Sequence, residues 1–244
     1  MQERVLEIGD RIVRALCTPE PRQVVLLPGG GSGREIWRPV LERLDGSVGA
    51  CAYDRVGAGE EGPPERGWFE LEDEMRRTHA ALGFERGYTL VGHGIGGLYA
   101  RLFASDRPTD VGGLVLVDPA HEDMPQEVRS GMPRAAWADW MQRRRRPNED
   151  GVTEVDLADR AGASRLPDRP VTVITATERP DGHGWDARFS NQAARRLHAS
   201  MLRGITLGRH VPAAGSGHDV HLEDPELVAR EIVRTVGVSQ GVHP

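Results

Sequence analysis

The sequence predicts an α/β fold in which a mostly parallel sheet carries helices on both faces. Three observations support this prediction. Continuous apolar runs of strand length, such as 24–27 and 111–117, alternate with segments of helical periodicity. A further apolar run at 88–91 leads through a glycine-rich turn into another helical pattern. The chain of 244 residues is 38% hydrophobic and 28% charged, a composition that suits one substantial globular domain.

The expected elements follow in order along the chain. An opening hairpin at 5–8 and 11–16 precedes strands at 24–27, 50–53, 88–91, 111–117, 171–175 and near 209–211. Helices are expected at 35–44, 69–82, 191–202 and 225–236. A further helix is expected directly after the glycine-rich turn. From about 120 to 168, spaced apolar residues predict one or two amphipathic helices instead of a strand. We expect this segment to form a lid over the carboxyl ends of the strands, inserted into a single domain that spans 1–244.

The composition excludes several classes of function. The formal charge of −6 argues against nonspecific nucleic-acid binding, which needs clustered positive charge. No apolar run approaches the roughly 18 residues of a membrane span, so no membrane partner is expected. The sequence contains no lysine, which excludes the usual Schiff base with pyridoxal phosphate.

The N-terminal residues and the two cysteines predict a cytoplasmic protein. Residues 1–4 lack the basic segment and apolar core of a signal peptide. Cys17 and Cys51 form no C-x-x-C pair, and Cys51 lies in an apolar strand pattern. We therefore expect Cys51 to be a buried, inert thiol.

The stretch 88–100 organises the chain. Its strand, glycine-rich turn and helix have the pattern of a nucleophile elbow, G-x-S-x-G, in which a sharp turn raises one side chain above a parallel sheet. Here the raised position is Gly94, which has no side chain. The same letters spell the dinucleotide fingerprint G-x-G-x-x-G, with Asp118 about 20 residues further on. That fingerprint usually follows the first strand of its unit, whereas this turn follows about four strands, which argues against dinucleotide binding.

Four places in the chain together match one known family. They are the loop 28–31, the segment 53–59, the turn 91–97 and the segment 217–225. Through them the sequence resembles the α/β-hydrolase superfamily over nearly its whole length. The resemblance implies an α/β-hydrolase fold with a mostly parallel eight-stranded sheet, helices on both faces and a small helical lid at about 120–168.

The resemblance also implies site residues. It makes His218 the catalytic base, and it makes the backbone amides of Ile95 and Gly30 an oxyanion hole. Gly94 stands at the vacant nucleophile position. The usual histidine-glycine opening of the oxyanion loop is replaced by Pro28 and Gly29.

The acid that supports His218 follows one of two strands. Asp118 follows the strand that ends at 117 and is the favoured candidate, while Glu178 and Asp181 follow the strand that ends near 176. The alternative role for Asp118 is structural, capping the strand and ordering the next turn through His121. No cofactor is expected. A metal pair of His218 and His221 lacks a third spaced ligand, so no metal is expected either.

The leading hypothesis is an enzyme that lacks the serine nucleophile and uses His218 for acid–base chemistry. Isomerisation, epimerisation, cyclisation or lyase-type cleavage of a small carbonyl compound, of the natural-product kind, suits such a site. Its expected partner is this small molecule, held in a lidded apolar pocket. One alternative is a serine esterase or lactonase in which Gly94 replaces the natural serine. The other is a non-catalytic protein that binds a small molecule.

Overall fold

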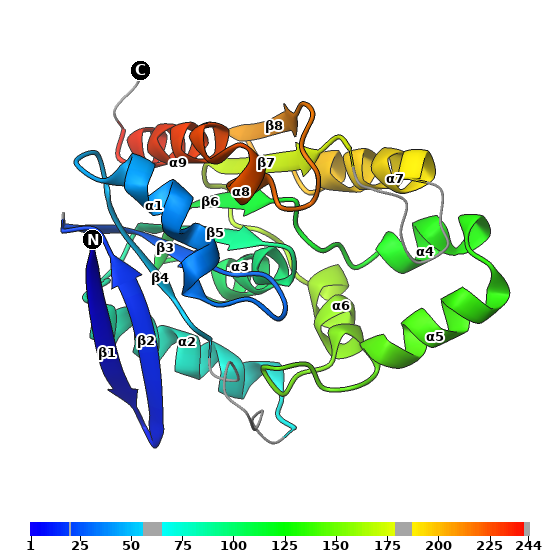
Figure 1. Cartoon of the computed structure of the whole chain (residues 1–244), viewed down its shortest axis with the longest axis horizontal. Coiled ribbons are helices and arrows are strands. Elements are labelled where there is room, and N and C mark those ends of the chain that lie inside the picture. Colours follow the sequence, from blue (N-terminus) through cyan, green and yellow to red (C-terminus); the bar gives the residue numbers. More distant parts are fainter. Residues whose placement is uncertain (20, 56–64, 179–186, 242–244) are drawn as a thin grey trace.

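The computed structural model contains one eight-stranded sheet with helices on both faces (Figure 1). The structure describes residues 1–19, 21–55, 65–178 and 187–241. The strand order is β1-β2-β4-β3-β5-β6-β7-β8. The pairs β1–β2 and β2–β4 are antiparallel, and all the other neighbours are parallel. The predicted fold class is confirmed.

The strands lie close to their predicted positions. They are β1 (Gln2–Ile8), β2 (Arg11–Cys17), β3 (Arg22–Leu27), β4 (Gly49–Tyr53), β5 (Tyr88–His93), β6 (Val111–Val117), β7 (Val171–Ala176) and β8 (Gly208–Ala213). The helices outside the 120–168 segment are η1 (Arg34–Trp37), α1 (Arg38–Leu44), α2 (Trp68–Leu82), α3 (Ile95–Asp106), α7 (Ala187–Ser200), α8 (Val220–Glu223) and α9 (Pro225–Ser239). The helix expected over 35–44 therefore begins with a 3-10 turn.

The central strands are buried on both faces, which explains their continuous apolar sequences. Alternate residues of one strand enter different cores: Val25 and Leu27 of β3 pack with α2 and α3, whereas Val24 and Leu26 pack with α1 and α9. The same alternation occurs along β6. A strand that contributes to two cores cannot slip by one residue without exchanging them, so this packing fixes the register.

The expectation of a free Cys51 thiol is wrong. Cys17 of β2 and Cys51 of β4 are paired across the antiparallel strands and form a disulfide. The antiparallel register places the two residues directly opposite each other, which no spacing rule in the sequence reveals. Because disulfides persist mainly in oxidising compartments, the cysteines give no support to the cytoplasmic assignment.

The segment between β6 and β7 is helical, as expected, but contains more elements than expected. It consists of α4 (Met124–Val128), η2 (Arg129–Gly131), α5 (Arg134–Arg144) and α6 (Glu154–Ala163). In Figure 1, α4 and α5 extend to the right of the sheet, while α6 lies next to α3. None of the helices in the described part of the chain is both long and apolar enough to cross a membrane.

Candidate active site

The turn between β5 and α3 is built from closely packed glycines. Gly94 has a φ of +54° and a ψ of −121°, a backbone conformation that L side chains rarely adopt. A Cβ atom on Gly96 would lie 2.4 Å from the carbonyl oxygen of Pro28, and one on Gly92 would lie 2.3 Å from the carbonyl oxygen of Gly96. Glycine is therefore required at 96, because the turn packs directly against the loop that follows β3, and at 92, because β5 packs against the first turn of α3.

His218 and Asp118 form a complete pair next to this turn. The Nδ1–H of His218 donates to Oδ2 of Asp118 at 2.6 Å, and the backbone N–H of Ala176 donates to Oδ1 of the same carboxylate at 3.1 Å. Asp118 is only 1% exposed, whereas the His218 side chain is 51% exposed. The bond at Nδ1 fixes the tautomer of the neutral imidazole and leaves Nε2 as a proton acceptor.

Position 94 lies directly in front of that acceptor nitrogen. A Cβ atom built on Gly94 would lie 3.3 Å from Nε2 of His218 and 3.9 Å from Cα of Gly29. A side chain there would point between the imidazole and the loop after β3. The structure therefore brings Gly94, His218 and Asp118 together, with no side chain at position 94 in front of the imidazole.

The loop that carries Gly30 lies beside the start of α3. Ile95 is the first residue of α3, so its N–H has no acceptor within the helix and lies at the positive end of the helix dipole. The loop after β3 approaches it closely, because a Cβ atom on Gly30 would lie 3.7 Å from Cγ2 of Ile95. The N–H of the next residue, Gly31, donates to Oε1 of Glu149 at 2.8 Å. The amides of Gly30 and Ile95 thus belong to neighbouring segments.

A buried arginine that the sequence analysis missed holds this loop in place. Arg55 donates to Oδ2 of Asp150 at 2.9 Å, to the carbonyl oxygen of Gly29 at 3.1 Å and to the carbonyl oxygen of Pro28. It also contacts Glu149 at 3.2 Å. Burial opposes its charge, but Asp150, Tyr99 and Glu149 together outweigh burial and raise the pKa of Arg55 above its ordinary value. One guanidinium therefore joins the loop after β3 to residues of the 120–168 segment.

Two further histidines lie behind His218. The Nε2–H of His93 donates to the carbonyl oxygen of His218 at 3.1 Å, and the ring of His93 lies 4.3 Å from the ring of His221. Burial first, and then the neighbouring His218, lower the pKa of His93 to about 4. Burial lowers the pKa of His221 to about 3. Both rings are therefore neutral near pH 7.

A protein-family model described as "alpha/beta hydrolase fold" matches residues 23–206. The chain belongs to the α/β-hydrolase fold family. The uncharacterized protein YqjL of Bacillus subtilis (strain 168) is 25% identical over 213 residues, which covers 84% of this chain and 79% of that protein. "Putative carbamate hydrolase RutD" of Escherichia coli O6:H1 is 27% identical over 242 residues, covering 83% and 84%.

A solved relative supports the fold independently. The structure of a thermophilic esterase from Thermogutta terrifontis, with malate bound, superposes with a TM-score of 0.67 over the full length of both chains at 19% identity. At this identity the likeness establishes the α/β-hydrolase fold alone.

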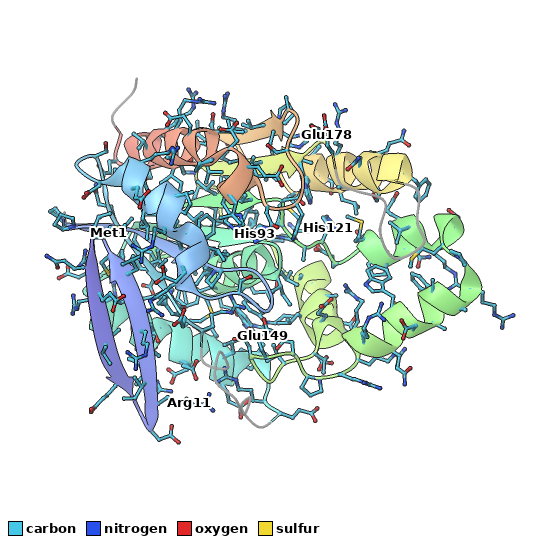
Figure 2. All side chains as sticks on the ribbon, viewed as in Figure 1. Met1, Arg11, His93, His121, Glu149 and Glu178 are labelled. Carbon is cyan, nitrogen blue, oxygen red and sulfur yellow. A yellow bond between two sulfur atoms is a disulfide. The ribbon has the colours of Figure 1, made fainter. Side chains whose placement is uncertain are left out.

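The candidate acids differ in where they lie. Asp118 contacts His218, whereas Glu178 is exposed and lies near the upper rim of the molecule in Figure 2, away from His93 at its centre. Asp181 lies outside the described residues. Of the two candidates that the structure describes, Asp118 is the one whose carboxylate pairs with His218.

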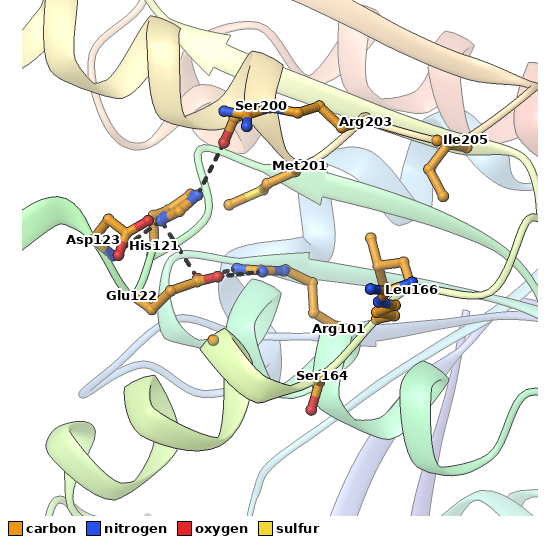
Figure 3. Close-up of a pocket in the computed structure, with 13 residues that line it drawn as sticks. Arg101, His121, Glu122, Asp123, Ser164, Leu166, Ser200, Met201, Arg203 and Ile205 are labelled. Carbon is orange, nitrogen blue, oxygen red and sulfur yellow. Dashed lines mark hydrogen bonds and ion pairs between the residues drawn. The ribbon is translucent and has the colours of Figure 1, made fainter.

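A pocket of about 610 Å³ lies beside α3, near the ends of α6 and α7 and the segment after β6 (Figure 3). Some of its polar groups bond to one another: Arg101 donates to Glu122 at 2.6 and 2.9 Å, and Nδ1 of His121 accepts from the backbone N–H of Asp123 at 3.1 Å. Neither His218 nor the turn at 94 lines this pocket. It is therefore a separate, largely polar hollow, and the lidded apolar pocket stays a prediction.

Proposed function

We propose that this chain, a single domain of the α/β-hydrolase fold, catalyses acid–base chemistry on a small carbonyl compound without a covalent intermediate. One observation carries the proposal. The pair of His218 and Asp118 is complete, yet position 94, directly in front of Nε2, has no side chain. We place the reacting substrate carbon at this position, where a serine would otherwise give its hydroxyl proton to the base.

The proposed reaction begins with proton transfer from the carbon next to the carbonyl group. Nε2 of His218 takes this proton, and the electron pair of the broken C–H bond moves to the carbonyl oxygen, which becomes an enolate. The N–H groups of Ile95 and Gly30 donate hydrogen bonds to the enolate oxygen. The carboxylate of Asp118 stabilises the imidazolium that forms. His218 then returns the proton at the same or another atom.

The fate of the enolate distinguishes the reaction classes. Protonation of the opposite face by a donor other than His218 gives epimerisation, return of the proton by His218 to a different atom gives isomerisation, and attack of the enolate carbon on a second carbonyl group gives cyclisation. Reversal of that last step cleaves a carbon–carbon bond, as in a lyase. The natural-product substrate class depends on the family resemblance.

We further propose that the 120–168 segment acts as the lid. Glu149 accepts from the N–H of Gly31, and Asp150 pairs with the buried Arg55 that holds the same loop. This segment therefore touches the loop that carries the proposed oxyanion donor Gly30. A lid that is fixed at this point excludes water from the enolate, which would otherwise be quenched by random protonation.

Hydrolysis is the alternative, and the names of the relatives favour it. The Thermogutta terrifontis protein is an esterase and RutD carries the name of a carbamate hydrolase. A hydrolytic reaction at this site would use water, activated by His218, in place of the missing nucleophile.

A solvent-exchange experiment distinguishes these functions. The protein is incubated in deuterium oxide with a panel of ketones, 1,3-diketones and β-keto esters, and separately with p-nitrophenyl esters and lactones. We expect enzyme-dependent deuterium incorporation next to the carbonyl of at least one ligand, measured by mass spectrometry. Saturable ester or lactone hydrolysis without exchange in any carbonyl ligand would overturn the proposal, as would tight ligand binding with neither reaction.

A further inference from the structure

Three side chains with metal-binding groups meet behind the candidate active site. They are His93 at the end of β5, Asp219, and His221 in α8, and one nitrogen or oxygen atom from each lies within 4.8 Å of the other two. Nε2 of His93 and Oδ1 of Asp219 are 3.7 Å apart. The cluster lies beside His218 but does not include its Nε2 atom.

The buried ring of His221 is the observation that indicates a bound ligand. Its side chain is 0% exposed, and neither ring nitrogen has a hydrogen-bond partner among the described residues. Its ring lies 4.9 Å from the ring of Trp37 and 4.3 Å from the ring of His93. Buried polar atoms in folded proteins nearly always have a partner, so the unsatisfied ring indicates a bound species that the protein chain does not supply, and a single ion would satisfy one of the two nitrogens.

We propose that His93, Asp219 and His221 bind a divalent transition-metal ion, with zinc as the best match. Imidazole nitrogen together with one carboxylate oxygen is a donor set that zinc accepts in four-coordinate geometry. With metal–ligand bonds of 2.0–2.2 Å, tetrahedral ligands lie about 3.4 Å from one another. The separation of 3.7 Å between His93 and Asp219 is close to this value, and the ligand atoms all lie within 4.8 Å of one another, so binding draws them together.

The fourth ligand and the proton balance also follow from the geometry. The carbonyl oxygen of His218 lies 3.1 Å from Nε2 of His93, close enough to coordinate the same ion, and water is the other source. At present the Nε2–H of His93 donates to that carbonyl group. Metal binding therefore replaces this hydrogen bond, and the Nε2 proton leaves to solvent.

The position of the ion defines its role. Asp219 and His221 follow His218 directly in the chain, whereas His93 belongs to the central strand β5. A bound ion would tie the loop that carries His218 to the centre of the sheet. This is a structural site, and it does not depend on the reaction proposed for His218.

The test is zinc binding by tag-free protein from which metals have been removed with a chelator. Isothermal titration with zinc chloride should show one equivalent bound. Asp219→Asn should weaken binding at least tenfold, and since the Asp219 side chain is 57% exposed, this variant is expected to fold. Glu226→Gln is the matched control, because Glu226 is an exposed acid of the same region outside the cluster, and it should bind zinc like the wild type.

Cobalt(II) provides a second readout. The wild type should show the intense visible bands of four-coordinate cobalt, and Asp219→Asn should lose them. His221→Gln should behave in the same way if it folds, and Asp219→Asn suffices if it does not. The proposal is overturned by the absence of saturable zinc binding in the wild type, which would leave water as the partner of His221. Equal binding by the wild type and Asp219→Asn would also overturn it.

Discussion

Restoring a serine at the turn should create a measurable esterase. In Gly94→Ser, the Cβ atom lies 3.3 Å from Nε2 of His218, and the hydroxyl group one bond further can come within the 2.6–3.2 Å that an activated nucleophile needs. The φ of +54° is unfavourable for serine and should lower the free energy of unfolding by about 1–3 kcal/mol. The half-exposed imidazole can shift to accept the new atom.

The gain in activity should be large but incomplete. In subtilisin, loss of the nucleophile costs about 2 × 10⁶ in kcat, which sets the upper limit for restoring one. Because the rest of this site is not adapted to acyl transfer, we expect ester hydrolysis to rise by about 10² to 10⁴. Stopped-flow measurement with p-nitrophenyl acetate should show a burst of acyl-enzyme, and a fluorophosphonate probe should label Ser at position 94.

Gly94→Ala is the matched control. It carries the same backbone strain without a hydroxyl group, so it should lose the same stability and gain no burst. The reasoning is refuted if Gly94→Ser folds with the stability of Gly94→Ala yet shows neither a burst nor labelling. In that case Nε2 of His218 does not reach the position that the structure gives it.

Three further predictions concern the framework. Burial lowers the pKa of His79 to about 3 in the folded protein. As the pH falls, the imidazole of His79 is therefore protonated in the unfolded chain before it is protonated in the folded protein. The stability from this group is therefore complete above pH 6.5 and should fall by about 2–3 kcal/mol by pH 4.5. Urea titrations should show that His79→Gln lacks this part of the pH dependence, and an unchanged dependence would contradict the assignment. Asp150→Ala leaves Arg55 without its closest carboxylate and should cost about 3–5 kcal/mol in urea unfolding, whereas a loss below about 1 kcal/mol would show that the pair is not essential. Replacing both Cys17 and Cys51 by serine opens a loop of 34 residues and should lower the free energy of unfolding by about 3–4 kcal/mol. Two free thiols in a thiol titration of the unfolded wild type would contradict this prediction.

The sequence predicts the fold well because the central strands are buried on both faces. Their apolar runs have the right length and end in glycine-rich or acidic turns, and β6 has the predicted bounds of 111–117. The contact between Asp118 and His218 is also foreseeable. Both residues follow parallel strands, so both lie at the same edge of the sheet although they are 100 residues apart in sequence.

Contacts between segments that are distant in the chain could not be predicted from the sequence. Arg55 and Asp150 are separated by 95 residues, and nothing in their spacing indicates which acid pairs with which arginine. The disulfide depends on the register of β2 against β4, which only the folded sheet defines. The sequence likewise offered His218 and His221 as a metal pair without a third ligand, whereas the folded chain brings His93 and Asp219 to His221 instead.

The most direct test of the proposed chemistry is deuterium exchange by His218→Ala with a carbonyl ligand that the wild type exchanges. General acid–base catalysis contributes about 10² to 10⁴, so the exchange rate should fall by that factor. Ligand affinity, measured by calorimetry on the same two proteins, should stay nearly constant. An exchange rate in His218→Ala equal to that of the wild type would contradict the account.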